Sequence, residues 1–126
     1  MTGTHYRNSV FQHVLRGGPA GGGYMTVEDL LAFDVALRSN ALVSKGMLDR
    51  MWRAYPEKNS PTYGYDFGIS ETPADRAVDR SGGFASISAD FLMCLDAGNT
   101  LAVLPNYGNG APPVSQKIQK LVGRKK

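Results

Sequence analysis

The stretch GGFASISADFLMCLDAGNTLAVLPN, residues 82–106, decides the fold class. Two extended and mostly apolar runs flank DAGN at residues 96–99, a turn sequence typical of β-hairpins. We expect Pro105 to end the second run, because proline has no N–H to donate to a strand ladder. A bend is expected in the first run, near Gly82 and Gly83. The stretch therefore predicts two antiparallel strands.

The segment TYGYDFGIS, residues 62–70, predicts a third strand. Apolar side chains alternate there with small or polar ones, which is the period of a strand with one buried face. The apolar face consists of Tyr63, Tyr65, Phe67 and Ile69. ETPADR at residues 71–76 follows as a turn or short loop.

Two helices are predicted before these strands and one after them. Residues 26–39 begin with Thr26 as a cap and Asp29 three positions later, which resembles a capping box. A second helix is expected to begin at Ser44, and Pro113 is expected to open the third. Apolar residues recur at helical spacing in all three: Val27, Leu30, Leu31, Phe33 and Leu37; Met47, Leu48, Met51 and Trp52; Val114, Ile118 and Leu121. The predicted fold is α+β, with a three-stranded antiparallel sheet, two helices before it and a C-terminal helix.

Length and charge indicate a single domain. The chain has 126 residues and 42% hydrophobic content, which is enough for one core. We expect a weakly ordered segment at residues 1–16, a domain at residues 17–122 and a basic tail at residues 123–126. The net charge of +3 comes from five cations among the last ten residues. Because these cations decorate the end of a predicted helix rather than a broad face, we do not expect nucleic-acid binding.

Several classes of site find no support in the sequence. Cys94 is the only cysteine and lies in an apolar run, so we expect a small buried residue rather than a disulfide or metal ligand. His5 and His13 lack acidic or thiol neighbours at metal-ligand spacing. The glycine-rich residues 17–24 match neither a P-loop nor a dinucleotide fingerprint. We expect no metal, no cofactor and no membrane span.

Three segments occur in the order and spacing of a known family: residues 17–52, with a glycine-rich loop and a capped helix; YGYDFGI at residues 63–69; and the run from Arg80 to Pro113 that begins RSGGF. Over residues 17–122 the chain resembles the C-terminal part of the serine β-lactamase and penicillin-binding-protein-like family. The nearest branch is the class C β-lactamase-related esterases and peptidases. The resemblance implies a partial β-lactamase-like fold and acyl transfer on β-lactams, peptides or esters.

The resemblance also implies a substrate-binding site at residues 80–83. The family motif of Lys or His, then Ser or Thr, then Gly maps onto Arg80, Ser81 and Gly82. By this resemblance Ser81 binds a substrate carboxylate or carbonyl, and the Gly83 N–H is the second donor of an oxyanion hole. The chain departs from the family pattern at Arg80, where this branch usually has His, and at Asp66, where glycine is expected.

The nucleophile of that family is missing from the chain. No serine is followed by lysine three positions later, so the Ser-x-x-Lys motif is absent. Residues 6–8, YRN, match the Tyr-x-Asn motif, but they lie too close to the glycine-rich loop for the family layout. We therefore predict part of a serine hydrolase that is inactive alone and has no catalytic residue of its own. The alternative is a non-catalytic binding or interaction module derived from that fold.

The predicted partners follow from the incomplete sheet. We expect a small carboxylate or acyl substrate, and either a homo-oligomer or a missing N-terminal segment to pair the open edge. A compact monomer in which residues 1–16 fold back is the alternative. The candidates for an uncovered apolar surface are Tyr63, Tyr65, Phe67, Phe91 and Leu101. The resemblance implies a bacterial periplasmic or extracellular location, whereas a genuine start at Met1 implies the cytoplasm.

Overall fold

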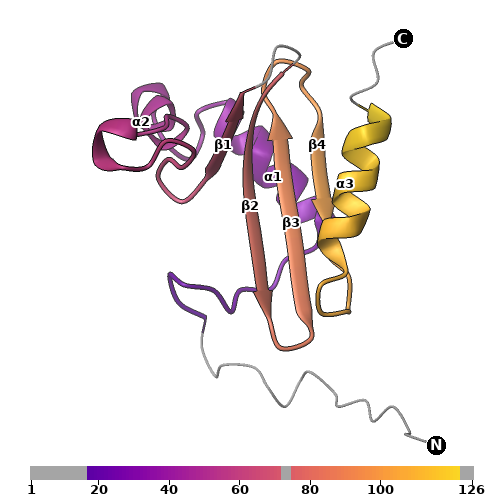
Figure 1. The fold of residues 1–126 in the computed structure, drawn as a ribbon. Helices are drawn as coiled ribbons and strands as arrows, with labels where there is room; N and C mark the ends of the chain where they lie inside the picture. Colours follow the sequence, from indigo (N-terminus) through magenta and orange to yellow (C-terminus); the bar gives the residue numbers. More distant parts are fainter. Residues whose placement is uncertain (1–16, 72–74, 123–126) are drawn as a thin grey trace, which may run out of the picture.

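The computed structural model describes residues 17–71 and 75–122, and it is an α+β fold, as predicted (Figure 1). The predicted N-terminal segment, the basic tail, both histidines and Tyr6 to Asn8 lie outside the described residues. Four strands form one antiparallel sheet in the order β1-β2-β3-β4. The elements are α1 (Val27–Arg38), α2 (Lys45–Met51), a 3₁₀ turn (Pro56–Lys58), β1 (Gly68–Glu71), β2 (Arg76–Phe84), β3 (Ile87–Cys94), β4 (Thr100–Val103) and α3 (Ala111–Val122).

The sheet has four strands rather than the predicted three, because the run that begins at Gly82 is divided between two of them. Gly82 and Gly83 lie in extended β2 and do not form a bend. The chain reverses instead at Ala85 and Ser86, between the paired residues Phe84 and Ile87. Ser86 has a left-handed φ of 63°, which a two-residue hairpin turn requires of at least one central residue.

The strand predicted over residues 62–70 is shorter in the structure. Only Gly68–Glu71 forms β1. Before it, the Gly64 N–H donates to the Phe67 carbonyl at 2.8 Å, and Asp66 has a φ of 66°, so the alternation of faces is broken there. Of the predicted apolar face, Phe67 and Ile69 are buried, whereas Tyr63 and Tyr65 are exposed.

The main core lies between α1, α2 and one face of the sheet. Strand residues Ile69, Val78, Phe91 and Met93 pack there with helix and loop residues Leu37, Leu48, Trp52 and Phe67. Phe67 and Phe91 are therefore not an uncovered surface, and Leu101 is half-buried. Val27 and Leu31 of the predicted α1 stripe are exposed beside β4 and do not join this core.

Helix α3 packs against β3 and β4, on the side of the sheet away from β1 (Figure 1). Its first residue, Ala111, donates its N–H to the Ser88 Oγ at 3.1 Å. The helix starts two residues before Pro113, since proline is tolerated in the first turn, where its missing N–H has no helical partner. Its buried residues are Ala111 and Ser115, so the predicted stripe through Val114 and Leu121 is wrong: both are exposed.

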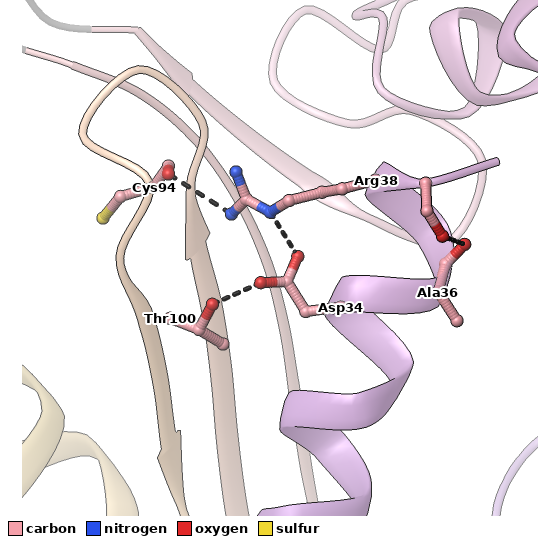
Figure 2. A network of polar contacts seen from close by, with 6 residues as sticks. Asp34, Ala36, Arg38, Cys94 and Thr100 are labelled. Carbon is pink, nitrogen blue, oxygen red and sulfur yellow. Dashed lines mark hydrogen bonds and ion pairs between the residues drawn. The ribbon is translucent and has the colours of Figure 1, made fainter. Parts of the chain in front are cut away.

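A polar network fixes α1 to the β3–β4 hairpin (Figure 2). The buried Asp34 carboxylate accepts hydrogen bonds from the Arg38 Nε at 2.6 Å and from the Thr100 hydroxyl. Arg38 also donates through Nη2 to the Cys94 carbonyl at 3.3 Å. The network satisfies a carboxylate that would otherwise be costly to bury, and it sets the position of α1 on the sheet.

Candidate functional site

Strand β2 has two halves with different neighbours. Residues 76–79 pair with β1 on one side and β3 on the other. Residues 80–84 pair only with β3, because β1 begins at Gly68, opposite Asp79. Among the described residues, the second half of β2 is therefore a free edge of the sheet (Figure 1).

Backbone groups of Ser81 and Gly83 face this free edge. The Leu95 N–H donates to the Arg76 carbonyl at 2.7 Å, so Arg76 bonds toward β3. In an antiparallel ladder the direction alternates with each residue, and the even-numbered residues of β2 therefore bond to β3. It follows that the N–H and carbonyl groups of Ser81 and Gly83 point away from β3.

These two N–H groups suit an extended ligand better than a single oxygen. Groups two residues apart on a strand are separated by roughly 6.8 Å, too far for both to bind one oxyanion. Gly83 can thus supply one oxyanion donor, and a second would have to come from elsewhere. A Cβ on Gly82 would meet nothing within 4 Å and one on Gly83 only the Ile87 carbonyl at 3.5 Å, so the edge is open to close approach.

The side chains of Arg80 and Ser81 project to opposite faces of the sheet, because successive strand residues alternate. Arg80 donates through Nη1 to the Tyr63 hydroxyl at 2.6 Å, and its Nη2 lies 3.2 Å from an Asp66 carboxylate oxygen. Both members of this ion pair are exposed, with 46% of the Arg80 side chain and 72% of the Asp66 side chain accessible to solvent. The predicted cation is therefore present at the edge, but it already has an anionic partner.

Acidic side chains dominate the face that bears Ser81. Asp90 lies directly opposite Ser81 on β3, and Asp79 is two residues before Ser81 on β2. Burial, followed by the charge of Asp90, raises the pKa of the Asp79 carboxyl. The Ser81 side of the edge therefore repels anions, and a ligand carboxylate would find a cation only on the Arg80 side.

The described residues contain no group of three or more His, Cys, Asp and Glu side chains that could hold a metal ion. Cys94 is half-buried, and burial, followed by a hydrogen bond and a charge from Asp75, raises the pKa of its thiol to about 11. It is therefore protonated at neutral pH and is a poor nucleophile. In the same part of the chain, no helix has the length and hydropathy needed to cross a bilayer.

The opposite edge of the sheet, β4, also has no further strand paired with it among the described residues, although α3 packs nearby. The Cys94 N–H donates to the Asn99 carbonyl at 2.9 Å, so by the same alternation the backbone groups of Thr100 and Ala102 face outward. Beside them, α1 and β4 enclose a shallow cavity of about 270 Å³. It is lined by Val27, Glu28, Leu31, Thr100 and Ala102.

Comparison with known proteins identifies no relative. No protein-family model matches the chain, and no curated protein or solved structure matches it either. The resemblance to the serine β-lactamase family therefore rests on sequence motifs alone.

Proposed function

We propose that the chain is the C-terminal portion of a β-lactamase-like serine hydrolase, which supplies the substrate-binding strand and one oxyanion donor. The observation that supports this most directly is the free half of β2. It presents Ser81 and Gly83 backbone groups to an open edge, with Arg80 beside them. An acyl substrate that lies along this edge can accept the Gly83 N–H at its carbonyl oxygen.

The remaining parts of the reaction must come from outside this chain. Acyl transfer needs a nucleophile and a base within hydrogen-bond reach, and the sequence has no Ser-x-x-Lys motif. We therefore expect the isolated chain to leave a chromogenic cephalosporin and a short p-nitrophenyl ester intact. Turnover by the isolated chain that Ser81→Ala abolishes would contradict the proposal, because Ser81 would then be the nucleophile.

The positive test supplies the missing part. We expect the DNA upstream of Met1 to encode Ser-x-x-Lys in the same reading frame, and co-expression of that segment to produce hydrolysis. Gly83→Pro removes the edge N–H and should lower kcat by about 100-fold or more. Gly46→Ala, in α2, is the control, since a Cβ there meets nothing within 4 Å. Equal rates for the two variants would exclude Gly83 as an oxyanion donor.

A second candidate function is a non-catalytic interaction module, and the β4 edge, which has no strand partner among the described residues, favours it together with its adjacent cavity. Unpaired strand edges recruit other chains. We expect a homo-oligomer or a complex with an N-terminal segment in light scattering at micromolar concentration. A monomer of 13.6 kDa that remains monomeric when residues 1–16 are deleted would contradict this expectation.

A further inference from the structure

The turn that carries Asp66 is fixed by the backbone. The Gly64 N–H donates to the Phe67 carbonyl at 2.8 Å, and the Tyr65 N–H donates to the Met51 carbonyl at 3.0 Å. A Cβ on Gly64 would lie 2.1 Å from that same Met51 oxygen, so the turn is pressed against the end of α2. Asp66 has a left-handed φ of 66°, a conformation that glycine adopts without cost and that Asp and Asn tolerate better than other residues. The turn therefore holds Asp66 beside the β2 edge independently of its carboxylate.

The Asp66 carboxylate occupies the position where Arg80 would receive an anion. Its Oδ1 lies 3.2 Å from the Arg80 Nη2, while the Tyr63 hydroxyl accepts from Nη1 at 2.6 Å. Both partners belong to the segment just before β1, and Arg80 is the first residue of the free half of β2. A ligand carboxylate that approaches Arg80 must displace Asp66 or bind close to its negative charge.

The other charges near the edge act in the same direction. Arg80 is the only cation in β2 beyond the end of the β1 pairing. Asp79 and Asp90 lie on the opposite face of the strands, and Asp66 lies at Arg80 itself. One cation therefore stands against one acid on its own face and two on the opposite face, and this balance of charge disfavours an anion at the edge.

We propose that Asp66 is a specificity-determining residue that makes the β2 edge select uncharged acyl groups, such as esters and amides, over carboxylates. This inference rests on the proposed function, because it assumes that the edge binds an acyl ligand. Asp66 acts as an internal competitor for the Arg80 guanidinium. An uncharged carbonyl does not need that guanidinium, since it can accept from the Gly83 N–H.

The expected effect of Asp66 is modest because its ion pair is exposed. Exposed Asp–Arg pairs contribute little, so a ligand can displace this one. Removing the carboxylate should tighten the binding of a small carboxylate about two- to fivefold. The same change should leave an uncharged amide unaffected.

The experiment is an NMR titration of the full chain, following the amide signals of residues 80–84 with sodium acetate and, separately, with acetamide. Asp66→Asn is the test variant, because asparagine tolerates the left-handed φ. Asp66→Gly is the second variant, since it removes the charge and the backbone strain together. Glu57→Gln is the matched control: Glu57 pairs with Arg53 at 2.8 Å, both side chains are exposed, and the net charge changes equally.

We expect acetate to bind about two- to fivefold more tightly to both Asp66 variants than to the wild type or Glu57→Gln. Acetamide should bind all four proteins equally. If acetamide shifts residues 80–84 but acetate affinity is the same in all four, the edge binds acyl groups and the role of Asp66 is wrong. An equal gain in Glu57→Gln would also overturn that role, since net charge would explain it. Titrations without shifts at residues 80–84 in any protein would overturn the ligand site of the proposed function as well.

Discussion

Among the residues that the structure describes, two Asp–Arg pairs differ mainly in exposure. In α1, Asp34 pairs with Arg38 at 2.6 Å, and only 4% of the Asp34 side chain is exposed. At the β2 edge, Asp66 pairs with Arg80 at 3.2 Å in contact with solvent. The first pair lies on α1 and links the helix to the β3–β4 hairpin. The second joins the loop before β1 to the free edge of β2. The same chemical groups therefore serve the fold in one place and are accessible to a ligand in the other.

The physical reason is the cost of removing one partner. A buried charge that loses its partner is left without compensation from water, whereas an exposed charge is solvated again. Stability should therefore depend strongly on the Asp34–Arg38 pair and weakly on the Asp66–Arg80 pair.

Arg38→Ala should lower the free energy of unfolding by about 3 kcal/mol, because it leaves the buried Asp34 carboxylate with the Thr100 hydroxyl as its remaining side-chain partner. Urea denaturation measures this change. Arg53→Ala is the control, because Arg53 makes an exposed pair with Glu57 and should cost less than about 1 kcal/mol. A loss below about 1 kcal/mol in Arg38→Ala would remove the distinction between the two kinds of pair.

Gly64→Ala should lower the free energy of unfolding by about 2 kcal/mol, because the new Cβ would lie 2.1 Å from the Met51 carbonyl oxygen. The turn that holds Asp66 would have to move away from α2. Gly46→Ala should have the opposite sign, since its Cβ meets open space within a helix and alanine favours helix. Thermal unfolding of the two variants gives the comparison, and a loss in both would indicate that close approach to Met51 is not the cause.

Arg80→Ala should change the free energy of unfolding by less than about 1 kcal/mol, since its pair with Asp66 is exposed. The difference in stability between Arg80→Ala and the wild type should be smaller still in about 0.5 M salt, because salt screens exposed charges. Urea denaturation at two salt concentrations measures it. A loss as large as that of Arg38→Ala would mean that the β2 edge depends on this pair for its structure.

Asp79→Asn should have the smallest effect, and one that depends on pH. Burial and the nearby Asp90 raise the pKa of Asp79, so the folded state favours its protonated form. The stability that comes from protonation is present at low pH and is lost as the pH rises through the raised pKa. The variant should therefore be more stable than the wild type at about pH 7 and equal to it at about pH 3. Melting curves across this range would contradict the prediction if the difference were constant.

The helices could be predicted from the sequence because their signals are local. The Thr26 hydroxyl accepts from the Asp29 N–H at 3.1 Å, and the Asp29 carboxylate accepts from the Thr26 N–H at 2.9 Å, which confirms the capping box. Ser44 caps α2 through its hydroxyl, which accepts from the Met47 N–H at 3.3 Å. Each cap lies within three residues of the group it satisfies, so no tertiary information is required.

The part of β2 before Gly82 was not predicted, because its pattern is not that of a half-buried strand. Only Ala77 and Val78 are buried, and the following residues are charged, small or exposed. The strand is held by its neighbours, β1 and β3, and tertiary pairing determines its conformation.

The partners of the two Asp–Arg pairs could not be predicted from the sequence either. Thr100 is 66 residues from Asp34, and Tyr63 is 17 residues from Arg80. One signal was available for the first pair: Asp34 lies between Leu30 and Leu37 on the helix face that contacts the sheet. An acid at such a position indicates a buried polar partner, although it does not identify Thr100.

The strand order of the sheet predicts the order in which parts of the molecule fold. Because β1-β2-β3-β4 follows the order of the chain, every ladder joins strands that are neighbours in the sequence. Such local contacts close short loops and form early, whereas the Asp34–Thr100 contact spans 66 residues and should form late. Substitutions in the β2–β3 hairpin should therefore slow refolding, and Thr100→Val should mainly accelerate unfolding. Stopped-flow kinetics would thus show a sheet that assembles before α1 is locked onto it.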